Sequence, residues 1–316
     1  KMGLLVSFAR LKLSVNADNQ QAAQLIEKLE QKEPQIKRPK VRFQNWLGEL
    51  EDLEAVIAES DLLQEHEFFL NELAEKSKYL LSEEEEVLIA EMQNTGANAW
   101  EKLRQKLTSN LMVEITIEGE EQELPLSKVR NLAYEEDADL RKKAYHAELE
   151  AYEKIDEAVA SCLNSIKGES LTIVDKRGYE SPLEKSLLDS RVDKEILDAM
   201  LEAIQESLPQ FEKYYQQKAK LLGHDQGLPF YDLFAPLGAE SKEFSYQEAR
   251  EFIVNNFRSF SEQLADYADQ AFAENWIDAQ PRSGKRGGAF CMNLHPIGAV
   301  KQLYYILLNL TFYINK

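Results

Sequence analysis

Histidine is the side chain that most often binds zinc in enzymes, and the chain has four: His66, His146, His224 and His295. A peptidase-type zinc helix needs the pattern H-E-x-x-H, with two imidazoles one turn apart and a glutamate that activates water. His66 is followed by Glu67, but Leu70 stands where the second histidine would be. His146 and Glu150 share one face of a predicted helix, a spacing more typical of an exposed polar pair. Local spacing therefore predicts no metal ligand in this chain.

The sequence contains no complete motif for nucleophilic catalysis either. Cys291 lies four residues before His295, but proximity in sequence does not make a nucleophile and base pair. The chain contains no G-x-S-x-G motif. Cys162 is the only other cysteine, so no disulfide framework or Cys-rich zinc site is available. We predict no catalytic residue, and a reducing cytoplasm is the simplest compartment.

A glycine-rich run, 283–288, has some features of a phosphate-binding loop. The P-loop pattern G-x-x-x-x-G-K-[ST] is broken twice, because Ala279 replaces its first glycine and Arg286 its final hydroxyl residue. A nucleotide site is therefore not expected. Gly287 and Gly288 better fit a place where the backbone closely approaches another chain segment or a bound peptide.

Composition indicates a helical, folded, acidic protein. The 316 residues include 56 acidic and 37 basic side chains, for a net charge of −19. Such a chain repels phosphate backbones and anionic lipid, so we expect neither nucleic acid nor membrane as a partner. With 44% hydrophobic residues and only 13 glycines, the chain has material for a core and favours helices over tight turns.

Three segments have the apolar periodicity of long helices, namely 131–167, 194–222 and 245–276. We expect the first to stop at Gly168 and the second to be kinked or divided at Pro209. Capping boxes are predicted at Ser82 and Ser245, and the acidic run after Ser82 is interpreted as a solvated helix start. Less regular helices are expected over 18–32, 36–58, 61–81 and 97–108.

Alternating apolar residues predict one β-hairpin over 111–126. A shorter strand is expected at 171–174, before a turn at Gly178. The segment 279–316 differs from the rest, because it has five basic residues and no acidic one. Its apolar part, 303–314, is too short for a membrane span and is either a buried strand or a segment not native to the fold.

The run 276–291, Trp-Ile-Asp-Ala-Gln-Pro-Arg-Ser-Gly-Lys-Arg-Gly-Gly-Ala-Phe-Cys, resembles the oligoendopeptidase F family. These are zinc metallopeptidases related to thimet oligopeptidase. Three further stretches agree with the family: 228–237, which contains Tyr-Asp followed by Pro-Leu, the helical stretch 130–144, and the hairpin. The resemblance runs from about residue 8 to residue 298.

The resemblance implies a mainly α, two-lobed fold around a channel that admits short peptides. Residues 1–145 would form the N-terminal helical region, and 146–316 the first part of a zincin catalytic domain. In the family the peptide aligns along strands by backbone pairing. The expected substrate-binding residues are therefore Gly287, Gly288, Ala289, Phe290 and Cys291.

The sequence departs from the family pattern where the zinc helix should follow. Zinc is expected for the full-length family member, but none is predicted to bind this chain, because both His ligands, the third ligand and the general base have no counterpart. We interpret the catalytic domain as truncated, 299–316 as a substituted end, and the chain as inactive alone. Exposed apolar surface would favour self-association or a missing C-terminal catalytic portion as partner.

Two alternatives remain open at this stage. The chain could be a non-catalytic helical module that binds peptides or pairs with a second chain supplying the zinc helix. It could also be an unrelated helical protein, in which case an open bundle or solenoid is expected instead of a groove beside 284–291.

Overall fold

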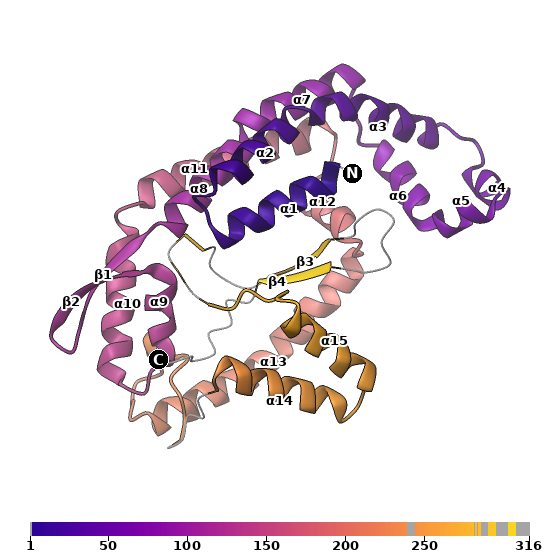
Figure 1. Ribbon diagram of the computed structural model, residues 1–316. Helices are drawn as coiled ribbons and strands as arrows, with labels where there is room; N and C mark the ends of the chain where they lie inside the picture. The colour runs from indigo at the N-terminus through magenta and orange to yellow at the C-terminus, as the bar shows by residue number, and fades with distance from the viewer. Residues whose placement is uncertain are drawn as a thin grey trace. The chain divides into compact units, whose positions relative to one another are not determined.

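The computed structural model (Figure 1) describes residues 2–238, 244–280, 282, 284–285, 290–294 and 303–307. Helices dominate these residues, and the only strands among them form two small antiparallel pairs. The predicted mainly α fold class with a small hairpin is therefore confirmed. Within the described residues, no helix combines the length and the apolar character needed to cross a membrane.

The helices and strands follow one another along the chain in a fixed order. The order up to the hairpin is α1 (Met2–Val15), α2 (Gln20–Glu30), α3 (Glu33–Gly48), α4 (Leu53–Ala58), α5 (Asp61–Glu65), α6 (Glu67–Ser77), α7 (Glu83–Thr95), α8 (Ala97–Ser109), β1 (Met112–Ile117) and β2 (Glu120–Pro125). Then come α9 (Leu126–Asn131), the 3-10 helix η1 (Leu132–Tyr134), α10 (Ala138–Tyr152), α11 (Asp156–Lys176), α12 (Pro182–Ser190), α13 (Lys194–Leu221), the 3-10 helix η2 (Phe230–Asp232), α14 (Tyr246–Arg258), α15 (Glu262–Ala273), β3 (Phe290–Leu294) and β4 (Leu303–Leu307).

The chain folds into two compact units. Unit 1 comprises Lys1–Ile26, Gln105–Ala158 and Ser207–Lys316, and unit 2 comprises Glu27–Arg104 and Val159–Glu206. Each unit takes residues from both regions that the sequence suggests, 1–145 and 146–316. That division by region therefore stays a prediction.

The hairpin organises the core of unit 1. Val113 pairs with Leu124 and Ile115 with Gln122, in the predicted place. Glu118 and Gly119 both have positive φ, at 53° and 87°, which is the backbone of a tight two-residue hairpin turn. One face of β1 is buried against α9 and α10, in a cluster of Leu111, Val113, Ile115, Val129, Ala144 and Ala151.

Unit 2 is built around α3, which packs against α6 and α7. The capping box predicted at Ser82 starts α7. The acidic run there is not wholly solvated, because Glu86 is fully buried and pairs with Arg177 at 2.5 Å and Lys37 at 2.9 Å. Burial would raise the pKa of Glu86, but the hydrogen bonds from these two cations outweigh it and hold the pKa low.

Two predictions around residue 170 are wrong. The helix expected over 131–167 is two helices, α10 and α11, and α11 runs through Gly168 to Lys176. The strand expected at 171–174 is part of α11. A glycine inside a helix costs only about 1 kcal/mol, which tertiary packing overrides. The glycine that ends this helix is Gly178, at φ 76°, where Tyr179 N donates to Val174 O.

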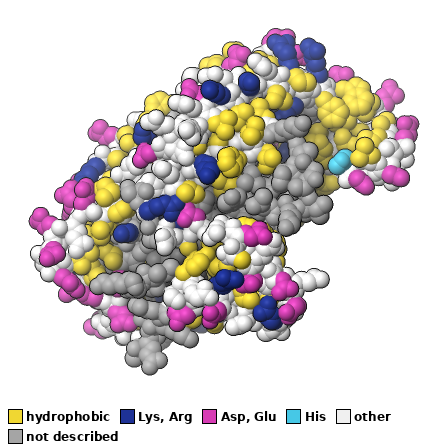
Figure 2. Space-filling view, in the orientation of Figure 1, with side chains coloured by type: hydrophobic (Ala, Val, Ile, Leu, Met, Phe, Trp, Pro, Cys, Tyr) yellow, Lys and Arg dark blue, Asp and Glu magenta, His cyan; other side chains and the backbone are white. Residues whose placement is uncertain are grey.

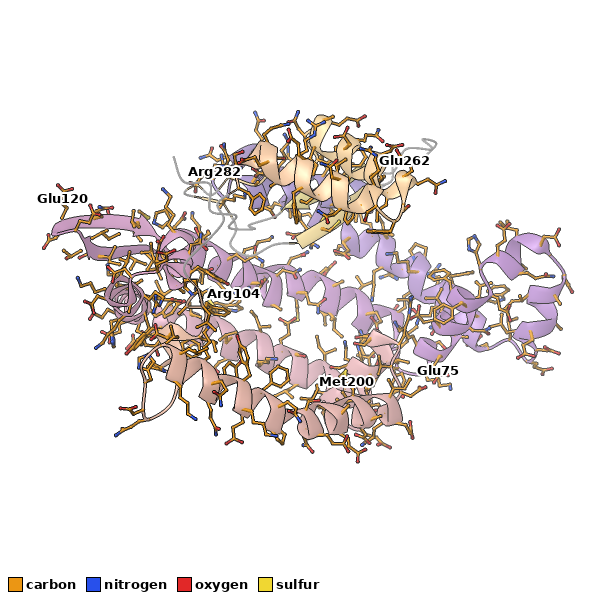
Figure 3. All side chains as sticks on the ribbon, turned by 90° about the horizontal axis from the view of Figure 1, so that it is seen from below. Glu75, Arg104, Glu120, Met200, Glu262 and Arg282 are labelled. Atoms are coloured by element: carbon orange, nitrogen blue, oxygen red, sulfur yellow. The ribbon has the colours of Figure 1, made fainter. Side chains whose placement is uncertain are left out.

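The later helices differ from the predicted ones in where they are divided. Pro209 lies inside α13 without dividing it, and the segment predicted as one helix over 245–276 is the packed pair α14 and α15. The capping box at Ser245 is confirmed. The apolar stripe of α13 is largely exposed: Met200 (labelled in Figure 3) is 53% exposed and Phe211 55% exposed.

Candidate functional site

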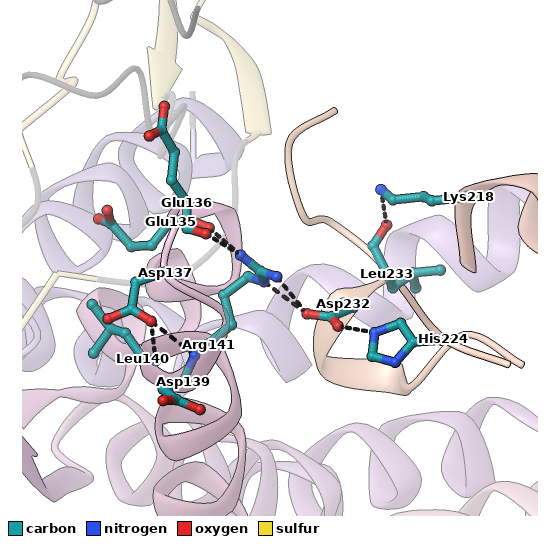
Figure 4. Close-up of polar contacts among 10 residues, drawn as sticks. All are labelled: Glu135, Glu136, Asp137, Asp139, Leu140, Arg141, Lys218, His224, Asp232 and Leu233. Carbon is teal, nitrogen blue, oxygen red and sulfur yellow. Dashed lines mark hydrogen bonds and ion pairs between the residues drawn. The ribbon is translucent and has the colours of Figure 1, made fainter. Parts of the chain in front are cut away.

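A buried ion pair joins α10 to η2 in unit 1 (Figure 4). Arg141 donates to Asp232 Oδ1 from Nε at 2.8 Å and from Nη2 at 2.7 Å, and both side chains are at most 3% exposed. The remaining terminal nitrogen of Arg141, Nη1, donates to the carbonyl oxygens of Glu135 and Glu136 at 2.7 and 2.9 Å. All three guanidinium nitrogens of Arg141 therefore donate hydrogen bonds. A buried guanidinium held in this way fixes the orientation of its partner carboxylate.

The second oxygen of Asp232 is also occupied. His224 Nε2 lies 2.6 Å from Asp232 Oδ2, and the imidazole is partly exposed. Nearby, the buried Lys218 donates to Leu233 O at 2.8 Å, and desolvation together with the Arg141 charge lowers the pKa of this lysine. These contacts fix the 228–237 segment. With both oxygens engaged, Asp232 is suited to hold the chain in place.

A second polar cluster precedes β3. Arg282, labelled in Figure 3, forms a two-pronged pair with Asp278, with Nη1–Oδ1 at 2.9 Å and Nη2–Oδ2 at 2.6 Å. The ammonium of Lys285 is buried and donates to Asp278 O at 2.7 Å and Gln280 O at 3.0 Å. The loop therefore closes around Lys285.

Neighbouring charges and burial shift the pKa values of this cluster in opposite directions. The hydrogen bond from Arg282 lowers the pKa of Asp278, and Lys285 adds to that effect. Burial lowers the pKa of Lys285, although the Asp278 charge opposes it. The cluster keeps a fixed set of charges in the loop that precedes β3 in the sequence.

The N-terminal helix α1 supports the same loop. Arg282 Nη2 donates to Val15 O at 3.0 Å, and Ala17 N donates to Gly284 O at 2.7 Å. Gly284 has φ 73°, a left-handed conformation that a side chain disfavours. Farther along, Met292 of β3 packs against Leu11 of α1. Residues from both ends of the chain thus position β3.

The predicted substrate-binding residues fall at and before this strand. Gly287, Gly288 and Ala289 lie outside the described residues, so the structure does not test them. Phe290 begins β3, and its backbone pairs with Leu307 of β4 in an antiparallel register. Cys291 is exposed, whereas Met292 faces α1, as alternation along a strand requires. Residues 303–307 form the strand β4, as one alternative for the C-terminal segment predicts, and the other alternative, a segment not native to the fold, stays a prediction.

The described residues do not fit a zinc ion. No group of three His, Cys, Asp or Glu side chains among them is placed to hold a metal. His66 lies at the junction between α5 and α6, and Leu70 stands one turn later, where a second ligand would be. His224 is held by Asp232, and His146 contacts the ring of Tyr145. His295 lies outside the described residues.

Sequence reasoning did not single out Arg141, Asp232, Asp278 or Lys285. All four lie in segments that carry the family resemblance. That resemblance is the only sequence signal that could have identified them as candidate functional residues. Their charges are typical of exposed positions, and their burial depends on partners far away in sequence.

Two of the grooves formed by the described residues of unit 1 differ in the character of their lining. One, of about 880 Å³, lies between the hairpin and α10 and mixes acidic side chains such as Glu123 with Lys142 and Lys143. The other, of about 430 Å³, lies along the last part of α13 and is lined mainly by Leu208, Phe211, Tyr215 and Leu228.

Comparison with known proteins gives consistent matches. A family model described as Peptidase family M3 matches residues 131–313, more than half of the chain, and one described as Oligopeptidase F matches residues 49–112. The first match includes 299–313, so it gives no sign of the break expected after Gly298.

Two relatives illustrate the sequence similarity. The Group B oligopeptidase PepB of Streptococcus agalactiae is 26% identical over 76% of this chain and 40% of its own length. Oligopeptidase PepF of Bacillus subtilis is 24% identical over 83% of this chain and 38% of its own length. The chain thus spans about two fifths of these relatives.

Solved structures agree in fold. The oligoendopeptidase-F of Enterococcus faecium has a TM-score of 0.67 at 19% identity, covering 87% of this chain and 52% of that one. PZ peptidase A with inhibitor 2 has a TM-score of 0.72 at 14% identity, covering 90% and 49%. At such identities the likeness concerns the fold alone.

Proposed function

Because the chain belongs to peptidase family M3, we propose that its residues form the peptide-holding part of an enzyme that hydrolyses short peptides. The observation that carries the proposal is the family match over 131–313, which includes the Asp278–Lys285 loop and β3. Peptidases of this family are generally zinc-dependent. A metal in such an enzyme polarises the scissile carbonyl and activates water.

The peptide would lie along β3. Within the described residues β3 pairs with β4 alone, so one of its edges lacks a strand partner. An extended peptide can add to such an edge through main-chain hydrogen bonds, largely without regard to its side chains. The small residues Gly287, Gly288 and Ala289 would allow a close backbone approach, with Phe290 and Cys291 at the start of the strand. The buried Lys285 and the Asp278 pair would hold the strand start rigid.

Hydrolysis would need residues that this sequence does not supply. No H-E-x-x-H pattern occurs in the 316 residues. We therefore expect the chain alone to take up no stoichiometric zinc and to cleave no peptide, since without a Lewis acid and a general base the barrier is not lowered. The enzyme would be complete only together with a zinc-binding portion.

The peptide-binding proposal is tested with matched ligands. Fluorescent peptides of about ten residues are titrated against the chain, each with a partner of identical side chains carrying backbone N-methyl groups. We expect binding of the unmodified peptide and its loss on N-methylation, because the methyl group removes the strand-pairing donors. Equal binding of both peptides, or none, would contradict the proposal.

The inactivity is tested separately. The same peptides with a fluorophore and quencher report cleavage in the presence of added zinc, and elemental analysis reports metal content. Zinc-dependent turnover by homogeneous chain would show that it contains the catalytic residues after all.

A further inference from the structure

The hairpin of β1 and β2 has an open edge. Within the described residues this sheet has only two strands, so β2 pairs with β1 on one side and with no strand on the other. Figure 3 shows the hairpin with Glu120 labelled near its tip. Residues 120–123 of β2 are all exposed, whereas β1 alternates between buried and exposed side chains. An open edge of this kind is a template for a further strand.

The register of the hairpin shows which backbone groups face outward. In an antiparallel ladder, hydrogen-bonded and non-hydrogen-bonded pairs alternate. Leu126 N donates to Leu111 O at 3.2 Å, and counting back from this bond places Glu121 and Glu123 in non-hydrogen-bonded pairs. The N–H and C=O groups of these two residues therefore point away from β1. Pro125 has the next outward position, where the hairpin needs no N–H donor.

The same two residues carry carboxylates that the described residues leave without a cation. Glu123 lies directly opposite Glu114, and Glu121 lies opposite Thr116 on the same face. Like charges in directly opposite positions destabilise a pair of strands. Lys154 pairs with Glu114 at 2.7 Å, but in the described part of the chain neither Glu121 nor Glu123 forms an ion pair. The β2 edge thus combines outward backbone groups with unneutralised negative charge.

The groove between the hairpin and α10 continues this acidic surface. Its volume is about 880 Å³, and acidic side chains outnumber basic ones in its lining. The acidic ones are Glu114, Glu121, Glu123, Asp139 and Glu150, and the basic ones are Lys142 and Lys143. Figure 2 shows acidic side chains over the part of the molecule where Figure 1 places the hairpin. Charge complementarity therefore favours a basic ligand.

A second copy of this chain fits the β2 edge poorly. Pairing two such edges would bring the glutamates of one copy against those of the other, and like charges on neighbouring strands repel. This repulsion protects the edge from association with itself. A strand that carries Lys or Arg in the facing positions meets attraction instead. The acidic edge therefore selects for the composition of the added strand.

We propose that the β2 edge binds an extended, basic segment of a partner protein, which adds to the hairpin as an antiparallel third strand. Basic residues at alternate positions would face Glu121 and Glu123. Their backbone groups would exchange hydrogen bonds with the outward N–H and C=O groups of the same two glutamates. The site is distinct from the peptide site proposed at β3, and the inference does not depend on that function.

The first test titrates the 316-residue chain with a fluorescent peptide, Thr-Lys-Thr-Lys-Thr-Lys-Thr. We expect binding that weakens as salt is added, and amide exchange at Glu121 and Glu123 slowed about tenfold or more. The same peptide with glutamate in place of lysine should not bind. Unchanged exchange on addition of the basic peptide, or amides already protected in the free chain, would overturn the inference.

Two backbone-methylated forms of the basic peptide separate strand pairing from simple charge attraction. In the antiparallel arrangement, the residues opposite Glu121 and Glu123 donate their N–H groups to β2, and the residues between them do not. Backbone N-methyl groups on the lysines should therefore abolish binding, whereas the same groups on the threonines should leave it. The side chains are identical in both forms. Equal binding of the two forms would contradict an added strand.

One variant and a matched control locate the site on the chain. Glu123→Lys places a positive charge against the basic peptide, and we expect binding to weaken about fivefold or more. The new lysine faces Glu114, so the melting temperature should not fall. Glu202→Lys makes the same charge change at an exposed position of α13 and should leave binding unchanged. Equal weakening by both variants would show attraction by the overall charge alone and contradict the site.

The readouts also separate this site from the one proposed at β3. A peptide that slows exchange in 290–294 but not at Glu121 and Glu123 supports the proposed function and overturns this inference. Slowed exchange at the two glutamates alone has the opposite meaning. A dimer of the free chain that Glu123→Lys disrupts would assign the edge to a second copy instead.

Discussion

Arg141 and Asp232 are 91 residues apart in sequence and form a buried ion pair, with Nη2 and Oδ1 2.7 Å apart. The pair ties the helix that covers the hairpin to the segment that follows α13. Removing one member of a buried pair leaves the other charge without compensation, and the cost exceeds what the intact pair contributes. The position of 228–237 therefore depends on this single contact more than on any sequence-local one.

The first prediction concerns that pair. Asp232→Asn keeps the shape of the side chain but leaves the Arg141 charge buried and unneutralised. We expect the free energy of unfolding to fall by about 3–5 kcal/mol in urea denaturation. The control is Arg250→Ala, which removes an ion pair with Asp269 at the surface and should cost about 1 kcal/mol or less. Similar losses in the two variants would mean that the pair is not the anchor described.

The second prediction concerns the loop before β3. Asp278→Asn weakens the contacts with Arg282 and Lys285, and we expect a local loss of about 1–3 kcal/mol. Trypsin should then cleave after Lys285 faster than in the wild type, as followed by mass spectrometry. Asp266→Asn, at an exposed pair with Arg258, is the control. Unchanged cleavage in Asp278→Asn would contradict a role for the carboxylate in closing the loop.

The third prediction is a pH dependence in unit 2. Glu72 accepts hydrogen bonds from Arg191 at 2.8 and 2.9 Å, which lower the pKa of Glu72 to about 2 from its ordinary 4.5. The Glu72 carboxylate binds a proton more readily in the unfolded chain than in the folded one. The stabilisation that Glu72 gives is therefore complete above about pH 4.5 and is lost as pH falls toward 2. In urea unfolding between these values, Glu72→Gln and Arg191→Ala should lose stability less steeply than the wild type. Parallel curves would contradict the assignment.

The fourth prediction uses the two thiols. Cys162 is fully buried and Cys291 is exposed on β3. A maleimide reagent should label one thiol rapidly and the second only after unfolding, and Cys291→Ser should remove the rapid phase. If peptide occupies the edge of β3, saturating peptide should slow the rapid phase, with the N-methylated peptide as control. Simultaneous labelling of both thiols would contradict the burial of Cys162.

The fifth prediction concerns metal removal. No described group of side chains is arranged to hold a metal, so a chelator should leave the melting temperature of the chain unchanged. A metal ion at a free concentration of about one hundred times its Kd would add about 2.7 kcal/mol to the free energy of unfolding, and a thermal scan detects such a change easily. A fall in melting temperature on chelation, reversed by zinc, would reveal a site among the remaining residues.

Much of the local structure follows from the sequence. The alternation of 111–117, with Glu118 and Gly119 at the turn, determines the hairpin, because a period of two fits only a half-buried strand. The capping boxes at Ser82 and Ser245 mark two helix starts, since side chain and backbone satisfy each other within four residues. The family signal is likewise a property of linear motifs, and the match to peptidase family M3 confirms it.

The sequence does not decide which of several possible helix breaks occurs. Gly168 and Gly178 are both plausible stops, and Pro209 a plausible break. Gly178 ends α11 because its backbone adopts the left-handed turn, whereas Gly168 and Pro209 stay helical. Propensities of about 1–3 kcal/mol per residue are small enough for packing to override.

Only the tertiary structure determines which charges are buried and which apolar faces are left open. Nothing in their local sequence distinguishes Arg141, Asp232 and Lys285 from exposed charges, because each is paired by groups that folding brings near. The stripe of α13 likewise has the spacing of a core helix and yet is exposed. Sequence determines what each element can bury, but burial itself is a relation between elements, so the ion-pair anchor and the open groove could be found only from the folded chain.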